Sequence, residues 1–255
     1  MNSNDAVASV AAICKRAIAI GLRGITLTDH INVYYGAERN REVVENVKED
    51  VASVRKEFGS RLEISLGIEL GEGHHDLPFF RELISDGEID FVIGSLHQPR
   101  NSLDYYEIDF DRSDVGAILD LYYEEMMEMA SGGCYDVIGH FNLPLRYMSA
   151  ALRAHTNLSP YLDRMRGILR EVARAGKGIE INTSGLWRGQ GFTLPTVDLV
   201  SVFREEGGEI VTIGSDAHRA EHVGLAIDGG MKCLAEAGFE KFAFFKKRVP
   251  HFYGL

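Results

Sequence analysis

The sequence is poor in the residues and segments that mark several classes of protein. Among its 255 residues there are only three cysteines, six prolines and one tryptophan. No apolar run approaches the ~20 residues that a membrane-spanning helix requires, and the first residues, MNSNDAVASV, lack the basic start and apolar stretch of a signal peptide. Cys14, Cys134 and Cys233 are too few and too far apart for a disulfide framework or a zinc knuckle. These absences predict a soluble cytoplasmic protein with reduced thiols and no membrane partner.

Basic residues are also in short supply. Lys and Arg number 27 against 38 Asp and Glu, which gives a formal net charge of −11. Binding to nucleic acids depends on a basic surface, so no nucleic-acid partner is expected. Apolar residues make up 45% of the chain, enough for a large core, and no low-complexity segment or linker interrupts it. We therefore expect one domain that spans residues 1–255.

Short apolar segments alternate with amphipathic ones along the chain. The expected strands are residues 24–28, 62–67, 90–94, 136–139, 178–181 and 209–213. The expected helices are residues 5–20, 38–58, 79–85, 115–130, 160–175 and 197–206. This alternation predicts an α/β fold with a mainly parallel sheet. The chain opens on a helix, however, where a closed barrel would have a strand.

Polar side chains stand at the end of each expected strand. They are Asp29 and His30, Glu69, His97, His140, Asn182 and Ser184, and Asp216 and His218. In a barrel of strands and helices these ends converge on one mouth, where active sites lie. Imidazole and carboxylate without cysteine form a ligand set for Zn, Mn or Fe. Four histidines and two carboxylates exceed the needs of one tetrahedral ion, so the pattern favours a multinuclear centre that binds and hydrolyses a phosphate ester.

The motifs ITLTDH, LGIEL, VIGSLH, DVIGHFNL, IEINTSG and IGSDAH occur in this order along the chain. Together they resemble the motifs of the PHP (polymerase and histidinol phosphatase) superfamily, most of all its histidinol-phosphate phosphatases. The resemblance implies a distorted (β/α)7 TIM-like barrel, two or three divalent metal ions, and hydrolysis of L-histidinol phosphate in histidine biosynthesis. By the same resemblance the metal ligands are His30, Glu69, His97, His140, Asp216 and His218.

The resemblance also implies roles for other residues. His30, Glu69, His97 and Asp216 are expected to be catalytic, and Arg146 and Arg188 to hold the substrate phosphate. Apart from the resemblance, Asp29 is expected to orient a ligand imidazole and not to bind metal itself, and Asn182 and Ser184 either line the substrate site or cap the end of their strand.

One family feature is absent from the sequence. Members of the family begin with a strand that ends in His-x-His, and here no histidine precedes His30. The barrel is therefore expected to lack its first strand, with Asn2 or Asp5 as remains of the loop that follows it. Unpaired strand edges predict an apolar groove, disorder near the N-terminus, or a partner strand that fills the gap, for example in a homo-oligomer. Either the start of the chain is assigned too late or the protein is a variant.

Two other functions stay open at this point. The same fold could act on another small phosphate ester or a nucleotide, or the chain could be a truncated, non-catalytic metal-binding remnant. The segment with His74 and His75 is expected to be a solvated loop. Glu124, Glu125 and Glu128 are expected to form a solvated helix face with no second metal site.

Overall fold

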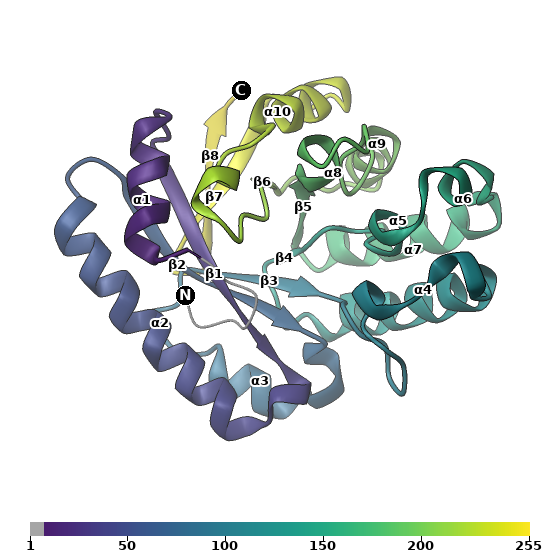
Figure 1. Cartoon of the computed structure of the whole chain (residues 1–255), viewed down its shortest axis with the longest axis horizontal. Helices are drawn as coiled ribbons and strands as arrows, with labels where there is room; N and C mark the ends of the chain where they lie inside the picture. The colour runs from purple at the N-terminus through teal and green to yellow at the C-terminus, as the bar shows by residue number, and fades with distance from the viewer. Residues whose placement is uncertain (1–7) are drawn as a thin grey trace.

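Six parallel strands form a curled sheet in the computed structural model, which describes residues 8–255. Neighbouring strands in the sheet are also consecutive in the chain, and helices lie outside them (Figure 1). The strands are β1 (Gly24–Asn32), β2 (Glu63–Gly71), β3 (Phe91–Ser95), β4 (Val137–Ile138), β5 (Gly178–Asn182) and β6 (Val211–Gly214). All six lie where the sequence predicts strands, and the expected barrel-like α/β fold is confirmed.

Most of the longer helices that connect the strands also follow the prediction. The longer ones are α1 (Val10–Ala19), α2 (Ala37–Phe58), α3 (Leu77–Leu83), α4 (Val115–Gly132), α7 (Leu162–Arg174), α9 (Val197–Glu205) and α10 (Ile227–Glu236). The short ones are α5 (Pro144–Tyr147), α6 (Ala150–His155) and α8 (Ser184–Trp187), with 3₁₀ turns η1 (Val33–Tyr35), η2 (Gly73–Asp76), η3 (Tyr105–Glu107), η4 (Phe110–Arg112), η5 (Ser159–Tyr161) and η6 (Ala220–His222). The sequence did not predict α10 or the short helices.

Within the described residues, the first helix begins at Val10, later than the sequence predicted. Ser9 caps α1 by accepting a hydrogen bond from the backbone N–H of Ala12 at 3.3 Å. The expected start at Asp5, the remains of a loop at Asn2, and the expected disorder near the N-terminus lie outside the described residues. No helix among residues 8–255 is long and apolar enough to cross a membrane.

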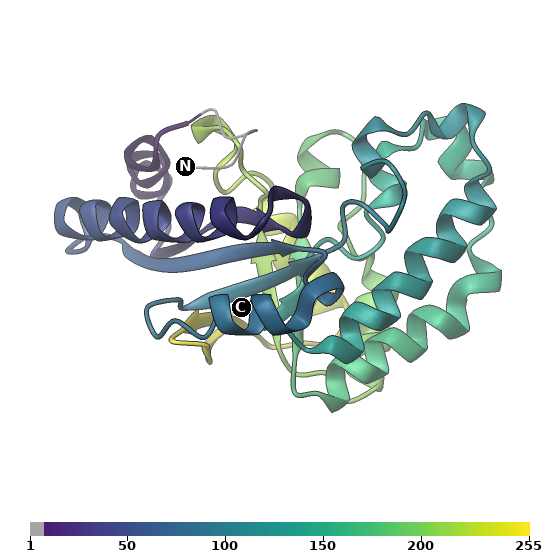
Figure 2. The same cartoon turned by 90° about the horizontal axis from the view of Figure 1, so that it is seen from below.

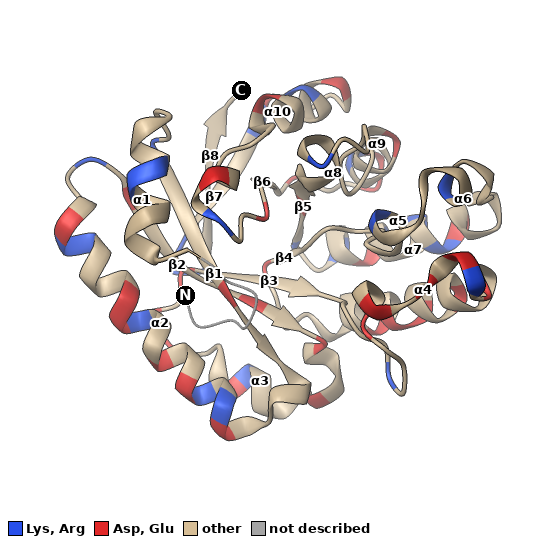
Figure 3. Cartoon of the chain, viewed as in Figure 1, with Lys and Arg blue, Asp and Glu red and all other residues tan. Residues whose placement is uncertain are grey.

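Burial on both faces explains why β2 reads as a nearly continuous apolar run. Every residue of β2 after Glu63 is buried, as expected for a parallel strand covered by a helix on one side. That cover is α2, which runs along β1 and β2 (Figure 2). It buries the valine stripe Val43, Val44, Val47, Val51 and Val54, while Lys and Arg alternate with Asp and Glu along its outer surface (Figure 3).

An antiparallel hairpin closes the end of the sheet where the strands begin. It consists of β7 (Lys241–Lys246) and β8 (Val249–Gly254), and the sequence gave no prediction of it. Phe245 packs against Phe91 with ring centroids 4.9 Å apart. Asp90 accepts hydrogen bonds from the backbone N–H groups of Lys247 and Arg248, at 2.9 Å each.

The sheet does not close on itself within the described residues. Strands β1 and β6 pair only with β2 and β5 respectively. A cavity of about 630 Å³ lies at this opening, and its lining includes Ile25 and Leu27 of β1, Ile213 of β6, and Phe242 and Phe244 of β7. The expected groove beside unpaired strand edges is therefore present.

The link between the hairpin and β4 provides a test of the fold. Arg248 donates through Nε to the buried Asp136 and through Nη1 to the carbonyl of Ile84 at 3.2 Å. Replacing Arg248 with Met leaves the Asp136 carboxylate buried without its closest cation. We expect the free energy of unfolding, measured by urea denaturation, to fall by about 2 kcal/mol.

Arg112 provides the matched control, because its side chain is 87% exposed and its nearest carboxylate oxygen is 3.6 Å away. Replacing Arg112 with Met should change the free energy of unfolding by less than about 0.5 kcal/mol. Equal losses in the two variants would show that the Arg248 contact does not fasten the hairpin.

Candidate metal centre

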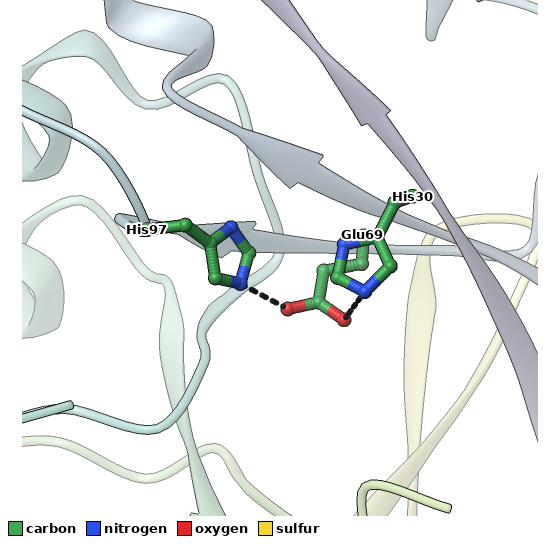
Figure 4. Close-up of side chains that lie close together, drawn as sticks. All are labelled: His30, Glu69 and His97. Carbon is green, nitrogen blue, oxygen red and sulfur yellow. Dashed lines mark ion pairs between the residues drawn. The ribbon is translucent and has the colours of Figure 1, made fainter. Parts of the chain in front are cut away.

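The centre is built around Glu69, which lies inside β2 and not at its end. In the ladder between β1 and β2, Glu69 stands directly opposite His30, so both side chains leave the same face of the sheet. His30 Nε2 lies 3.6 Å from Glu69 Oε2. Figure 4 shows the rings of His30 and His97 both directed at the Glu69 carboxylate.

The other oxygen of Glu69 receives three groups from the next two strands. Ser95 Oγ donates to Glu69 Oε1 at 2.8 Å, His97 Nε2 lies 3.2 Å from it, and His140 Nε2 lies 3.0 Å from it. The ligand atoms of His30, Glu69 and His97 all lie within 4.8 Å of one another. One carboxylate thus gathers three imidazoles predicted to be metal ligands.

Asp216 and His218 enter the same cavity from the segment after β6. Both line it together with His30, Glu69 and His140. The rings of His218 and His30 are 6.2 Å apart, and His218 Nδ1 lies 3.5 Å from Asp216 Oδ1. All six predicted ligands are therefore brought around one site.

The charges at this site are strongly coupled. Burial on its own raises the pKa of Glu69, but the neighbouring His30, His140 and His97 hold that pKa well below its usual range. Burial opposes the charged form of His97, yet hydrogen bonding to Glu69 and the charge of Glu72 raise the pKa of His97 to about 9. Burial lowers the pKa of His140 in spite of its contact with Glu69.

This donor set fits a divalent cation. The anionic Glu69 faces imidazole nitrogens that lie within hydrogen-bonding or ion-pair distance of it. Neutral imidazoles together with carboxylates are ligands for Zn, Mn or Fe. A cation placed among these atoms would compensate the charge of a carboxylate that is 8% exposed.

Glu180 on β5 belongs to the site, although the sequence analysis missed it. It accepts a hydrogen bond from the backbone N–H of His140 at 3.1 Å. Burial, followed by the charges of Asp216 and Glu69, raises the pKa of Glu180 to about 8. Gly214 makes room for its carboxylate, because a Cβ there would lie 2.1 Å from Glu180 Oε1. The sequence signal was the period of two in β5, which puts Glu180 on the same face as Asn182.

Arg146 is the predicted phosphate-binding residue that reaches the site. Its Nη1 lies 2.8 Å from Asp216 Oδ2, and the charge of Arg146 overcomes the effect of burial to lower the pKa of Asp216 to about 2. Asn182 Nδ2 donates to the same oxygen at 3.2 Å. Arg146 is 8% exposed, and its Nε and Nη2 are buried without a hydrogen-bond partner in the described structure.

The remaining predicted substrate residues lie next to this group. Arg188 lies over the ring of Trp187, 4.7 Å from its centroid, and the indole N–H of Trp187 donates to the carbonyl of Ser215 at 2.9 Å. Ser184 is buried, its backbone N–H donates to Asn182 Oδ1 at 3.0 Å, and its hydroxyl has no partner in the described structure. Among residues 8–255, no hydrogen bond or ion pair joins Arg188 to the histidine cluster.

A second missed residue, Glu72, ties together three strand ends. It lies just past β2, is fully buried, and has a left-handed backbone with φ of 51°. One carboxylate oxygen accepts from the backbone N–H groups of His97 at 2.5 Å and Gln98 at 2.9 Å. The other accepts from Asn32 Nδ2 at the end of β1. Positive φ recurs at His140, with 26°, and Asp216, with 53°, and such backbone strain gathers at functional sites.

Two sequence predictions near this site are wrong. The segment with His74 and His75 is not a solvated loop, because the two side chains are only 2% and 8% exposed. Glu125 does not belong to a solvated helix face, since it is buried and contacts both histidines, whereas Glu124 and Glu128 are exposed as expected. The helical positions of Tyr122, Met126 and Met129 put Glu125 on the packed face of α4.

The contacts of Glu72 predict that it positions His97 for a metal ion. In the variant Glu72→Gln, the side-chain N–H₂ would face that of Asn32, because the carbonyl is needed by the two backbone N–H groups. We expect affinity for Zn²⁺, measured by competition with a chromophoric chelator, to fall about 10- to 100-fold.

In the double variant Glu72→Gln/Asn32→Asp, the side-chain N–H₂ at position 72 again faces a carboxylate oxygen, at position 32. In the parent chain Asn32 Oδ1 accepts a hydrogen bond from the backbone N–H of Tyr34 at 2.9 Å, and Asp at position 32 can accept the same bond. Its Zn²⁺ affinity should return to within a few fold of the parent chain, while Asn32→Asp alone should be weaker. Unchanged affinity in every variant, with melting temperatures of the metal-free proteins also unchanged, would rule out the positioning role.

The chain is similar in sequence and in fold to known proteins. A histidinol-phosphatase from Lactococcus lactis is 30% identical over 244 residues, covering 90% of this chain and 85% of that protein. A probable histidinol-phosphatase from Deinococcus radiodurans is 28% identical over 241 residues, covering 91% and 89%. The solved histidinol phosphate phosphatase of Lactococcus lactis, complexed with Zn, L-histidinol and phosphate, has the same fold, with a TM-score of 0.79 at 23% identity over 98% of this chain and 95% of that chain.

The resemblance in the sequence motifs is thereby confirmed. The PHP domain profile matches residues 1–184, which is more than half of the chain. Together with the relative that is 30% identical over nine-tenths of this chain, this match establishes that the chain belongs to the PHP domain family.

Proposed function

We propose that this protein is a metal-dependent phosphomonoesterase that hydrolyses L-histidinol phosphate to histidinol and phosphate. The observation that carries the proposal is the cluster in which His30, His97 and His140 contact Glu69. Asp216 and His218 line the same cavity as Glu69, and Arg146, which has two unpartnered guanidinium nitrogens in the described structure, pairs with Asp216. The choice of substrate is supported by the relatives named histidinol-phosphatase, which align with about nine-tenths of the chain. As an enzyme of histidine biosynthesis it would act in the cytoplasm.

Two or three divalent ions of Zn, Mn or Fe are proposed to bind in this cavity. The residues that would hold them are His30, Glu69, His97, His140, Asp216 and His218. Glu69 is suited to lie between ions, because its two oxygens face different imidazoles. When bound, such ions supply positive charge to the phosphate oxygens and lower the pKa of a water molecule. The solved relative from Lactococcus lactis was complexed with Zn.

The side chains of the chain itself bind and orient the substrate. Asp216 fixes Arg146 through Nη1, so its Nε and Nη2 are left to donate charge-assisted hydrogen bonds to phosphate oxygens. Asn182 restrains the same carboxylate. Arg188 and Ser184 are proposed to complete the substrate side of the pocket. His30, Glu69, His97 and Asp216 are the residues proposed to be essential for turnover.

The open edge of the sheet leaves part of the site to be completed from elsewhere. Within residues 8–255, β1, which carries His30, and β6, which precedes Asp216 and His218, each have an edge beside the cavity with no paired strand. We propose that a further strand fills this gap, supplied by another segment or by a second copy of the chain in a homo-oligomer.

Activity measurements on the whole purified chain test the proposed function. Loaded with Zn²⁺ or Mn²⁺, it should release phosphate from L-histidinol phosphate, and chelation should stop the release until metal is restored. Replacing His97 or Asp216 with Ala should lower kcat/KM at least about 10²- to 10³-fold. His155→Ala is the matched control, because His155 is an exposed histidine on α6, and it should retain full activity.

A panel of substrates separates the alternatives. Faster turnover of a nucleotide or another small phosphate ester would keep the mechanism and change the substrate. A folded chain that holds at most one ion and releases no phosphate would instead indicate a non-catalytic metal-binding remnant. Full activity in both alanine variants would refute the assignment of the site.

A further inference from the structure

A second group of metal-type ligands lies outside the barrel and shares no residue with the centre around Glu69. His74 and His75 lie in η2, the turn that follows β2, and Glu125 lies on α4. His74 Nε2 is 3.1 Å and His75 Nε2 is 2.7 Å from the same atom, Glu125 Oε2. The two imidazole rings cross edge to face with their centroids 4.3 Å apart. The three ligand atoms lie within 4.8 Å of one another.

The charge of Glu125 is only weakly balanced by permanent cations, because Arg100 acts on it electrostatically without forming an ion pair with it. Its side chain is 3% exposed, and no Lys or Arg of residues 8–255 forms an ion pair with it. The guanidinium of Arg100 pairs with Glu128 at 2.6 Å, and only the backbone N–H of Arg100 donates to Glu125. A buried carboxylate in this position is stabilised by hydrogen bonds from the imidazoles and the backbone, and more strongly by protonated imidazole or a metal ion as its counter-charge.

The arrangement of the donors suits a metal ion. Two imidazole nitrogens and one carboxylate oxygen are sufficient protein ligands for a transition metal that keeps a position for solvent. Ligands about 2.0–2.1 Å from a tetrahedral ion lie roughly 3.3 Å apart. The separation of His74 from Glu125, 3.1 Å, is close to this value, and His75, at 2.7 Å, would have to move outward to admit an ion. A small cavity of about 10 Å³, lined by His74, adjoins the cluster and is the size of one water molecule, which could serve Nδ1 of His74.

We propose that His74, His75 and Glu125 bind one divalent transition-metal ion, with Zn²⁺ chemistry, at a structural site that fastens the turn after β2 to helix α4. The ion would also steady Glu72, two residues before His74, and through it the strand ends that carry His30 and His97. The inference concerns a site separate from the one proposed for hydrolysis and does not depend on that function.

Crystals of the whole chain soaked in ZnCl₂ test the proposal directly. An anomalous difference map collected at the zinc edge should contain a peak within bonding distance of His74, His75 and Glu125, in addition to any peak in the barrel. Absence of a peak at the cluster would overturn the proposal and would mean that the three side chains are joined by hydrogen bonds alone. A peak at the cluster without one in the barrel would support this site while counting against the proposed catalytic centre.

Matched variants give a second measure in solution. Elemental analysis after removal of loosely bound metal should find one zinc ion fewer per chain in His75→Gln than in the parent. Glu128→Gln should keep the full number, because Glu128 is an exposed carboxylate on the same helix. An equal zinc content in His75→Gln would contradict the proposal, and if that variant fails to fold the anomalous map alone decides.

Discussion

The structure depends above all on one buried carboxylate, that of Glu69, and on the imidazoles it gathers. Parallel pairing puts Glu69 opposite His30, and the next two strands deliver His97 and His140 to its other oxygen. A carboxylate at this depth is stable only with strong hydrogen bonds or a cation. The groups that stabilise the buried charge of Glu69 therefore bring nitrogen and oxygen atoms together at one point. Such converging donor atoms are what a metal ion requires.

Further buried carboxylates contact the segment of the chain that follows Glu69. Glu69 lies within β2, Glu72 just past its end, and His74 and His75 reach from the following turn to Glu125. Glu72 holds backbone groups of the segment after β3 and the side chain of Asn32, so movement at one strand end is resisted by the other two. The predicted metal ligands inside the barrel are thus held in position by polar contacts as well as by apolar packing.

The sequence was sufficient to predict the parallel sheet and the histidine and carboxylate residues that meet at one site, because each of them follows or ends a short apolar run. It was insufficient where tertiary contacts decide. Glu125 stands in a run of charge that suggested solvent, yet its neighbours Tyr122 and Met126 place it on the packed face of α4. Glu180 was hidden within a strand. The β7–β8 hairpin owes its place to Asp90 and Asp136, far away in the sequence, which no local pattern reveals.

The open edge divides the site into two unequal halves. Glu69, His97 and His140 belong to strands β2, β3 and β4 or follow them, and each of these strands is paired on both sides. His30 belongs to β1 and Asp216 follows β6, and in the described part of the chain each of these strands is paired on one side and borders the cavity. A single ladder of hydrogen bonds restrains a strand less than two ladders do. Occupation of the gap by a further strand would therefore sharpen the positions of His30 and Asp216 most, while the ligands around Glu69 are already held by the sheet.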